Sequence, residues 1–523
     1  GTVNVDNLNV GQGIPFATSA TFKEAVTVAT SLFLDTTATG TVTFDKTITA
    51  TGAAATIYLE SVNGSITVTG AITGKDYVYI ATTGSGSITL SGAISSDNAT
   101  GVIFIESTTG NVVTSGAIST SGSLAYIEID TVTSGNVIIG GSVSTSGGGD
   151  IVLAADNSST ATGTGNLTIN GTLTTTGTAA GDIILGISNG SAAVNKAVSA
   201  GATGDVVFIT TLATDAITIA SGATITAGDS VGDFGAGILN LGANITAGTA
   251  AAATTAGIIL DAATVNLTGA VSLKTGGTGT GADITLTTVN GAQNLTLEAI
   301  DQIVLSSVGQ TTALNTVTVT NSAGVTAGAF TAAKVVLTDT TGTVAFAGST
   351  VITNSLTTAA KAYNVSFAGT TTLFGAPVFL NTGNVSFAGN TSLISGATIT
   401  GSANSTVTLA VNSNISSGGV FNIGALPTTT INDGISMVLL GSNPSTFAGV
   451  VIMAAGDDVF LNGNTLTLSG DSSATFKGDF YLYDSALNVT GKLNSASEIF
   501  LNGGTITGPS GTIGNLTAEA IGI

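Results

Sequence analysis

Apolar and polar residues alternate along this chain in short runs that meet at glycines. In one run Ile66 and Val68 are separated by a polar residue, and Gly70 and Ile72 follow. Alternation with a period of two is typical of a β-strand with one buried face. The run therefore predicts two short strands joined at a glycine corner. Its other clear copies contain Gly92, Gly141, Gly171, Gly269 and Gly491.

These runs repeat at a nearly constant interval. The corner glycines fall at positions 70, 92, 116, 141 and 171, a period of about 20 to 30 residues that is typical of solenoids. A second strand series, which contains Ile80, Ile105, Ile129 and Leu153, keeps the same phase. We therefore predict an all-β fold, a single long parallel β-helix (β-solenoid) with about 20–25 residues and two to three short strands per coil.

The repeat divides the chain into three segments. We expect an irregular N-terminal segment or cap over 1–34, in which 22–29 forms a short helix or an irregular cap. Residues 35–340 are expected to form coils of about 22–30 residues, and 341–523 to continue the solenoid with tighter coils of about 20 residues. In the tighter coils Phe346, Phe367 and Phe387 are expected to form an inward aromatic column.

Charge is scarce and negative. Charged residues make up 7% of the chain, with nine cations against 30 carboxylates and a net charge of −21. Binding to nucleic acid or to an anionic membrane surface needs clustered cations, so both partners are excluded. No run approaches the roughly 20 apolar residues of a membrane-spanning helix, so membrane insertion is not expected. Cysteine is absent, so thiol chemistry and disulfides play no part.

The ends of a solenoid need protection, because a terminal coil exposes a row of unpaired backbone groups. One interpretation is that loops cover both ends. The other is that the ends stack on neighbouring subunits or continue into further sequence, and the pattern favours neither. The chain opens on the strand-like run Thr2 to Val5, so we expect a leader to have been removed or the sequence to be a fragment.

Catalysis is not expected. The chain contains neither His nor Cys, so it lacks the usual general base near neutral pH and the thiolate nucleophile. Its carboxylates are scattered, whereas enzymes that use carboxylates need them clustered. We therefore predict that the protein is not an enzyme.

Two groups of aspartates bear on metal binding. Asp150, Asp182 and Asp283 each precede an inward strand, and because stacked carboxylates repel each other, we expect them to be staggered. Asp457 and Asp458 are adjacent at a predicted turn. Aspartates at turns are more often structural, but carboxylate oxygens are the ligands that Ca²⁺ prefers. Asp457 and Asp458 are therefore the candidate metal ligands, and Ca²⁺ is the only cofactor that the sequence suggests.

One tyrosine pair is a candidate for glycan contact. Tyr481 and Tyr483 alternate with Phe480 and Leu482, so the two tyrosines share one strand face and the two apolar residues share the other. An exposed pair of tyrosines could stack on a sugar. Ordinary filling of a strand explains the same pattern and stays an alternative.

Several motifs carry a family resemblance. Strands begin with Asp-Ile-x-Leu at Asp150, Asp182 and Asp283, and the run Asn290 to Leu297 and the Asn-Val-Ser-Phe-Ala-Gly units at 364 and 384 have the same character. They resemble the repeats of large bacterial surface exoproteins of the filamentous-haemagglutinin and autotransporter-passenger type. The resemblance implies a β-solenoid that is secreted and exposed on the cell surface.

We therefore expect an extracellular structural protein, a subunit of a cell-surface fibre, sheath or surface layer formed by association of β-solenoids. Its partners would be copies of itself in a homo-polymer. The alternative is an adhesin stalk or passenger that displays a binding tip outside this chain. Host or cell-surface glycans are the alternative partner.

Overall fold

The computed structural model is all-β, and none of the residues that it describes is helical. The chain divides into two compact units, Gly1–Thr288 and Val289–Ile523. The described residues are 2–10, 19–36, 39–157, 163–177, 181–235, 237–249, 257–277, 281–375, 377–387, 391–393, 400–401, 406–409, 415–417, 428–431, 436–440, 445–447, 450–453, 458–463, 465–468, 479–491 and 499–507.

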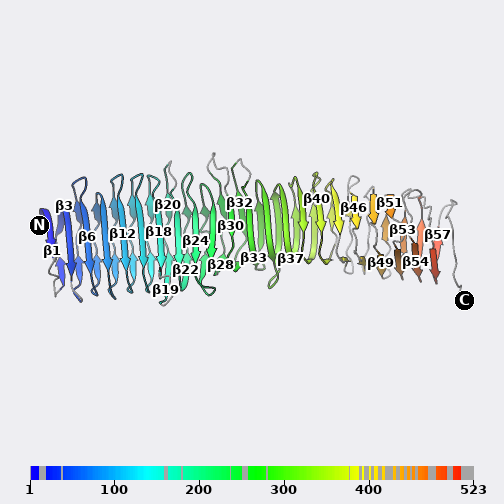
Figure 1. Cartoon of the computed structure of the whole chain (residues 1–523), viewed down its shortest axis with the longest axis horizontal. Helices are drawn as coiled ribbons and strands as arrows, with labels where there is room; N and C mark the ends of the chain where they lie inside the picture. Colours follow the sequence, from blue (N-terminus) through cyan, green and yellow to red (C-terminus); the bar gives the residue numbers. More distant parts are fainter. Residues whose placement is uncertain are drawn as a thin grey trace. The chain divides into compact units, whose positions relative to one another are not determined.

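Parallel strands stack coil upon coil in both units (Figure 1). The fold is a parallel β-solenoid of about 15 turns, with about 24 residues per turn, which confirms the fold class that the glycine-marked repeat predicts. In unit 1 a coil contributes three strands, and each pairs in register with its counterpart in the next coil, as β7, β8 and β9 pair with β10, β11 and β12. The result is three parallel sheets, which we call the first-, second- and third-strand sheets.

The first-strand sheet of unit 1 consists of β2 (Ala20–Phe22), β4 (Val42–Phe44), β7 (Ile66–Val68), β10 (Ile88–Leu90), β13 (Val112–Thr114), β16 (Val137–Ile139), β19 (Gly165–Ile169), β22 (Gly190–Val194), β25 (Ala216–Ile219), β28 (Ile238–Leu241) and β31 (Thr264–Leu267). The second-strand sheet consists of β5 (Ile48–Ala50), β8 (Ile72–Gly74), β11 (Ile94–Ser96), β14 (Ile118–Thr120), β17 (Val143–Thr145), β20 (Leu173–Thr175), β23 (Val198–Ser199), β26 (Ile225–Thr226), β29 (Ile245–Ala247) and β32 (Val271–Thr275). The third-strand sheet consists of β1 (Thr2–Val10), β3 (Ala25–Thr36), β6 (Thr56–Ser61), β9 (Tyr77–Thr82), β12 (Val102–Ser107), β15 (Tyr126–Thr131), β18 (Asp150–Ala155), β21 (Ile183–Ile187), β24 (Val206–Thr210), β27 (Val231–Gly235), β30 (Ile258–Leu260) and β33 (Ile284–Asn290). The long strand β3 also belongs to the second-strand sheet, because its first part pairs with β5.

Unit 2 continues with strands of more varied length. They are β34 (Asn294–Glu298), β35 (Gln302–Val308), β36 (Leu314–Asn321), β37 (Gly324–Leu337), β38 (Thr343–Phe346), β39 (Thr350–Thr358), β40 (Asn364–Phe367), β41 (Thr371–Leu373), β42 (Val378–Phe379), β43 (Asn384–Phe387), β44 (Thr391–Leu393), β45 (Thr400–Gly401), β46 (Thr406–Leu409), β47 (Ile415–Ser417), β48 (Thr428–Ile431), β49 (Ser436–Leu440), β50 (Ser445–Phe447), β51 (Val450–Met453), β52 (Asp458–Asn462), β53 (Thr465–Leu468), β54 (Asp479–Tyr483), β55 (Ala486–Val489), β56 (Ile499–Asn502) and β57 (Thr505–Thr507). Strands β50, β53, β55 and β57 form a separate parallel sheet.

The core of unit 1 consists of inward columns of aliphatic side chains. Ile66, Ile88 and Val112 are in-register neighbours and are fully buried. The sequence predicts this column, because each of these residues opens a glycine-marked run. Thr114 takes an inward place between Leu90 and Ile139, as its position in the repeat predicts. Every added coil lengthens these columns, so apolar burial grows with the number of coils.

Glycine is required at the corner between the first and second strands. A Cβ at position 92 would lie 2.2 Å from the carbonyl oxygen of Gly70, and a Cβ at position 116 would lie equally close to the carbonyl oxygen of Gly92. No side chain tolerates such an approach to the backbone. The corner glycines therefore let consecutive coils stack at the spacing of a parallel sheet.

The N-terminal residues are more regular than expected. The short helix or irregular cap that we expected over 22–29 is absent, and strands β2 and β3 account for most of this segment instead. In β3 the residues alternate between buried and partly exposed positions, and its Val26, Val28 and Leu32 are fully buried. This alternation has the period of a strand, which explains the difference. The segment boundaries at 34 and 340 stay predictions.

In unit 2 the predicted phenylalanine column is confirmed. Phe346, Phe367 and Phe387 are buried, and their ring centroids lie 4.9 Å apart from one coil to the next, with the rings nearly parallel. Face-to-face stacking at this spacing follows from the in-register pairing of β38, β40 and β43. The larger rings fill the interior of coils that are only about 20 residues long.

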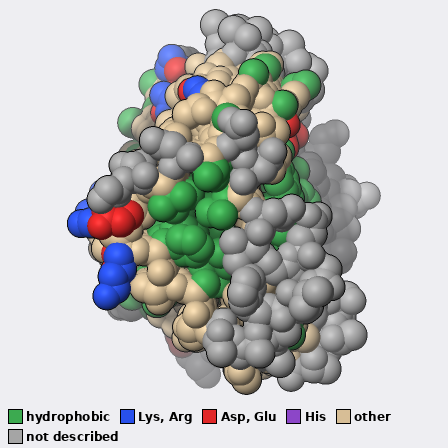
Figure 2. All heavy atoms as spheres, turned by 90° about the vertical axis from the view of Figure 1, so that its left-hand side faces the viewer, with side chains coloured by type: hydrophobic (Ala, Val, Ile, Leu, Met, Phe, Trp, Pro, Cys, Tyr) green, Lys and Arg blue, Asp and Glu red, His purple; other side chains and the backbone are tan. Residues whose placement is uncertain are grey.

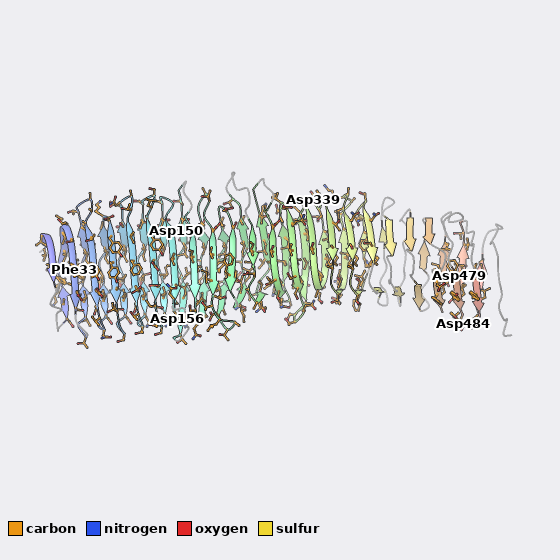
Figure 3. The ribbon with its side chains drawn as sticks, viewed as in Figure 1. Phe33, Asp150, Asp156, Asp339, Asp479 and Asp484 are labelled. Carbon is orange, nitrogen blue, oxygen red and sulfur yellow. The ribbon has the colours of Figure 1, made fainter. Side chains whose placement is uncertain are left out.

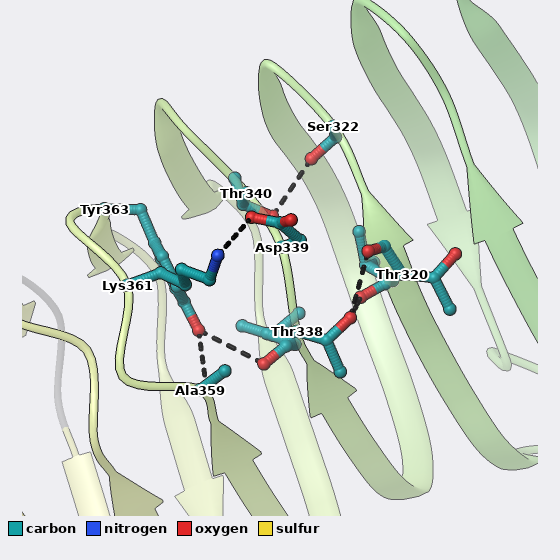
Figure 4. A network of polar contacts seen from close by, with 10 residues as sticks. Thr320, Ser322, Thr338, Asp339, Thr340, Ala359, Lys361 and Tyr363 are labelled. Atoms are coloured by element: carbon teal, nitrogen blue, oxygen red, sulfur yellow. Dashed lines mark hydrogen bonds and ion pairs between the residues drawn. The ribbon is translucent and has the colours of Figure 1, made fainter.

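A polar network links successive coils of unit 2 at one corner (Figure 4). Buried Tyr363 donates its hydroxyl to the carbonyl of Leu337 at 3.2 Å and accepts the backbone N–H of Ala359 at 3.1 Å. Outside it, Lys361 pairs with Asp339 at 3.4 Å. The buried phenol satisfies backbone groups that the turn would otherwise leave unpaired.

Hydrophobic side chains also gather on the face that unit 1 presents on its N-terminal side (Figure 2). They lie at the centre of this face and are bordered by Lys and by Asp or Glu side chains. Val3 and Val5 of β1 are among the exposed large hydrophobic residues.

Candidate functional site: an aromatic and acidic face of unit 1

The outward positions of the three sheets of unit 1 differ in chemistry. On the second-strand sheet most of them hold Thr or Ser, as at Thr73, Ser95 and Ser119 in successive coils. On the third-strand sheet one outward column is largely aromatic and aliphatic, and we call it the stripe. In register from β3 to β30, the stripe consists of Phe33, Tyr58, Tyr79, Phe104, Glu128, Val152, Ile184, Val207, Gly232 and Ile259.

The first four members of the stripe form a stack of rings. The ring centroids of Phe33 and Tyr58 lie 4.5 Å apart, those of Tyr58 and Tyr79 4.6 Å, and those of Tyr79 and Phe104 5.4 Å, with the planes within 11° of parallel. Figure 3 labels Phe33 at the start of this stack. Because the rings cover each other's faces, they present mainly their edges to solvent. Each stacked pair adds about 0.5–1.5 kcal/mol beyond burial.

A second outward column runs beside the ring stack. Tyr77, Val102 and Tyr126 are in-register neighbours in β9, β12 and β15. The smaller Val102 therefore separates two tyrosines that are two coil steps apart, or about 10 Å at the strand spacing of a sheet. The ring centroid of Tyr77 lies 6.0 Å from that of Tyr79 in the stripe.

Carboxylates lie on the other side of the ring stack. Asp35 pairs in register with Glu60, and Glu106 pairs in register with Asp130, while Glu128 lies in the stripe itself. We call the rings and these carboxylates the acidic aromatic patch. It consists of Phe33, Tyr58, Tyr77, Tyr79, Phe104, Tyr126, Asp35, Glu60, Glu106, Glu128 and Asp130.

Two phenols of the patch donate to carboxylates two residues further along their strands. Tyr58 donates to Glu60, and Tyr126 donates to Glu128 at 3.0 Å. Burial raises the pKa of both phenols, and the neighbouring glutamates raise it further. Burial, followed by nearby carboxylates, also raises the pKa of Tyr79 to about 12. These tyrosines therefore stay neutral hydrogen-bond donors over the physiological pH range.

Three carboxylates of the patch have a raised pKa. Burial raises the pKa of Asp35, and Glu60 raises it further. Burial, followed by Glu128 and Glu60, raises the pKa of Glu106. Burial is also the main reason why the pKa of Asp130 rises to about 7, although its hydrogen bond from Asn157 acts in the opposite direction.

Asp130 is the most enclosed member of the patch. Its side chain is 2% exposed. The amide of Asn157 donates to Oδ2 at 3.1 Å, whereas Oδ1 has no hydrogen-bond partner among the described residues. A buried carboxylate oxygen without a donor is unfavourable when ionised. The patch therefore has more negative charge than the described chain neutralises.

The other half of the stripe is aliphatic and uncharged. Ile209 and Phe234 are in-register neighbours. Ile209 is 39% exposed, Phe234 is 49% exposed and Ile259 is 41% exposed. We call these three residues, together with Ile184 and Val207 of the stripe, the aliphatic patch. Three exposed large hydrophobic residues thus lie close together on one face of unit 1.

Beneath the aliphatic patch lies a buried carboxylate. Asp233 of β27 occupies the inward column between Phe208 and Leu260 and is 1% exposed. Neither of its oxygens has a hydrogen bond of normal geometry among the described residues. Burial, followed by Asp261, raises its pKa to about 7, and the backbone of Ala262 lowers it only in part.

Asp150 and Asp182 are aligned, which corrects our expectation that these aspartates are staggered. The backbone N–H of Asp182 donates to the carboxylate of Asp150 at 2.9 Å, that of Asp205 to Asp182 at 2.9 Å, and that of Ser230 to Asp205 at 2.8 Å. Asp150 is labelled in Figure 3. Each carboxylate satisfies a backbone donor of the next coil, which offsets the repulsion between neighbours. Asp283 lies further along the same column, opposite Gly257.

The candidate metal ligands are only partly described. Asp457 lies outside the described residues. Asp458 opens β52 and pairs in register with Asp479 of β54, so two aspartates occupy one column. Among the residues that the structure describes, no three His, Cys, Asp or Glu side chains are grouped to hold a metal ion. Ca²⁺ at Asp457 and Asp458 stays a prediction.

The tyrosine pair has the orientation that alternation predicts. Phe480 and Leu482 are buried, whereas Tyr483 is 41% exposed. Tyr481 stacks between Phe460 and Phe500, with ring centroids 4.6 and 4.7 Å away. Both faces of the Tyr481 ring are therefore covered, and a sugar could reach only its edge and hydroxyl. Glycan contact by either tyrosine stays a prediction.

Comparison with known proteins identifies no relative: no family model, no curated protein and no solved structure matches this chain. A search of the described residues also finds no helix with the length and hydrophobicity needed to cross a membrane.

Proposed function

We propose that the protein is an extracellular structural subunit that associates side by side with copies of itself, through the aliphatic patch, into a fibre, sheath or surface layer. The observation that carries the proposal is the exposure of Ile209, Phe234 and Ile259 next to one another on one face. Burying apolar surface is the main favourable contribution to association.

The shape of the patch supports a second copy as its occupant. Its residues follow the stripe across consecutive coils β21, β24, β27 and β30, so it is straight and narrow. Another solenoid offers a matching straight surface, and a contact between this patch and a different face of the next copy leaves the assembly open for further copies, as a fibre or layer requires. None of the five patch residues is charged, and exposed Asp261 lies at the edge of the patch, two residues beyond Ile259, so the apolar contact itself brings no charge into the interface.

The composition supports a location outside the cell. The chain contains no cysteine and only 7% charged residues, so its stability is independent of the redox state of its surroundings. A hydroxyl-rich solenoid that grows coil by coil suits an extended surface structure.

The proposal is tested by comparing the wild type with Phe234→Thr/Ile259→Thr in sedimentation velocity at micromolar concentration. Threonine keeps the preference for a strand but removes apolar surface. We expect the wild type to form large assemblies and the double variant to sediment as a monomer. The matched control is Leu124→Thr, because Leu124 is 74% exposed but lies outside the patch.

Leu124→Thr should assemble like the wild type. Negative-stain images of the wild type should then contain polymers or layers. Monodisperse particles of the wild type at every concentration would contradict the proposal and favour the adhesin stalk, and so would a double variant that assembles normally.

A further inference from the structure

The acidic aromatic patch lacks a cationic counterpart. The strands that carry it, β3, β6, β9, β12 and β15, contain no Lys, and the whole chain has no Arg. The neighbouring Lys75 is already paired with Asp97 at 2.6 Å. Five carboxylates thus lie over five coils with no positive charge among them, although Glu60, Glu128 and Asp130 each accept a hydrogen bond from a neutral side chain.

We propose that the acidic aromatic patch binds a cationic polypeptide segment of another protein, with a Lys or Arg side chain seated over Val102 between the rings of Tyr77 and Tyr126. This surface is separate from the aliphatic patch, so the proposal is independent of self-association.

The position over Val102 fits one cation. Tyr77 and Tyr126 are two coil steps apart, so a cation midway between them lies about 5 Å from each ring, within the range of a cation–π interaction. Besides burial, the charges of Glu128 and Glu106 act on the Tyr77 hydroxyl, so both carboxylates contribute to the negative field at this position. One side chain could therefore contact two rings while its charge is attracted by two carboxylates.

The unsatisfied carboxylates add to the attraction. Glu106 and Asp130 are adjacent in register, and each has a raised pKa because ionisation is disfavoured there. Asp130 Oδ1 has no partner in the described part of the chain. A bound cation would offset the repulsion among these carboxylates and favour the ionised form of Glu106 and Asp130.

A chain with several cations fits better than a single small amine. Asp35 and Glu60 extend the carboxylate column beyond Glu106, two coils or more away. One exposed ion pair contributes only about 0–1 kcal/mol. Several such contacts on one flexible segment add through effective concentration.

Other occupants fit less well. A metal ion would need converging ligands, and the described carboxylates form no group of three that could hold one. A sugar needs free ring faces, but Phe33, Tyr58, Tyr79 and Phe104 cover each other. A second copy of this chain would bring its own five carboxylates to the interface, and like charges would repel.

The test uses the full chain in the Phe234→Thr/Ile259→Thr background, so that self-association does not interfere. The probe is a fluorescent 12-residue peptide of alternating Lys and Ser, with a Glu and Ser peptide as the negative control, and binding is followed by fluorescence anisotropy. One site variant is Glu106→Gln/Glu128→Gln, which keeps side-chain size. The other is Tyr77→Thr/Tyr126→Thr, because Thr56 occupies the same column in β6. The matched control is Glu24→Gln/Asp45→Asn, which removes two exposed carboxylates elsewhere.

We expect each site variant to weaken binding of the Lys peptide about tenfold, from the loss of two charge pairs or two ring contacts. The control variant should bind within about twofold of its parent, because distant exposed charges are screened. Equal weakening by the control and Glu106→Gln/Glu128→Gln would overturn the proposal, because binding would then depend on the total negative charge of the chain and not on the patch. Displacement of the peptide by a neutral hexose oligosaccharide, or by spermine at the same charge concentration, would overturn it in favour of a glycan or a small polyamine.

Discussion

Asp233 is the in-register neighbour of Phe208, so a carboxylate follows an aromatic ring in the inward column of unit 1. Every other described member of this inward column, from Leu34 to Leu286, is Leu, Ile or Phe. Such a position is unfavourable for a charge. Selection for stability alone would have removed it, which points to a role for Asp233 or to tolerance by the long core around it.

Asp233→Leu is expected to stabilise unit 1. The substitution continues the aliphatic column between Phe208 and Leu260 and removes a buried carboxylate that lacks a hydrogen bond. We expect the unfolding free energy at pH 8 to rise by about 2–4 kcal/mol. The measurement is urea unfolding followed by circular dichroism, and a fall in the midpoint at pH 8 would contradict the account.

The gain from Asp233→Leu should depend on pH. The pKa of Asp233 rises from 3.8 to about 7 on folding, so between these values the folded state holds a proton that the unfolded state has lost. The unfolding free energy of the wild type therefore falls as pH rises from about 4 to about 7. The gain should be small at pH 4 and complete above pH 7, and an equal gain at both pH values would contradict the raised pKa.

Asp130→Asn tests a second carboxylate whose ionisation should also lower the unfolding free energy as pH rises. The pKa of Asp130 also rises from 3.8 to about 7 on folding, mainly through burial, so the unfolding free energy of the wild type falls as pH rises from about 4 to about 7 and the loss is complete above pH 7. Asparagine keeps an acceptor for the amide of Asn157. We expect Asp130→Asn to raise the unfolding free energy at pH 8 by about 1–3 kcal/mol and to have little effect at pH 4.

Asp130→Asn and Asp233→Leu lie in distant coils, so their effects should add. The double variant should have a flatter dependence of stability on pH between 4 and 8 than either single variant. A double variant that keeps the slope of the wild type would assign the pH dependence to other carboxylates.

The architecture could be predicted from the sequence because each coil repeats the same constraints. Ile66, Ile88 and Val112 lie at equivalent places before Gly70, Gly92 and Gly116, and a parallel stack is the arrangement that brings equivalent residues together. The N-terminal segment was harder, because β3 has no corner glycine and is 12 residues long. Its alternation of buried and exposed residues was the signal for a strand.

The acidic aromatic patch was not predicted, although part of its signal is in the sequence. Phe33, Tyr58, Tyr79 and Phe104 all lie one residue after an inward aliphatic residue, which places them outward. Only the register between coils brings them into one column and brings Tyr77 and Tyr126 to either side of Val102. The raised pKa of Asp130 depends on burial beside a turn, which local alternation does not reveal.

Phe367→Ala is expected to be one of the most damaging substitutions in unit 2. Phe367 is fully buried and stacks between Phe346 and Phe387. Removing a buried ring costs about 3–5 kcal/mol, because the rigid backbone of the stacked coils cannot collapse into the cavity. Phe104 is the last ring of the outward-facing stack, so Phe104→Ala should lower the unfolding free energy by no more than about 2 kcal/mol. Urea unfolding of each variant gives the comparison, and similar costs would contradict the assignment of inward and outward columns.

Tyr481 and Tyr483 should separate stability from glycan contact. Tyr481→Ala removes the middle ring of the stack with Phe460 and Phe500, so we expect a loss of about 1–2 kcal/mol in unfolding free energy. Tyr483→Ala should change the unfolding free energy by less than about 0.5 kcal/mol, since its side chain is largely in solvent.

If the protein binds glycans here, binding on a glycan array at micromolar concentration should be lost in Tyr483→Ala, because Tyr483 has the more accessible ring. Tyr481→Phe, which keeps the stack and removes the hydroxyl, is the matched control and should retain that binding. Binding that survives Tyr483→Ala would rule out Tyr483 as the contact, and a stability loss in Tyr483→Ala equal to that in Tyr481→Ala would contradict the different environments of the two rings.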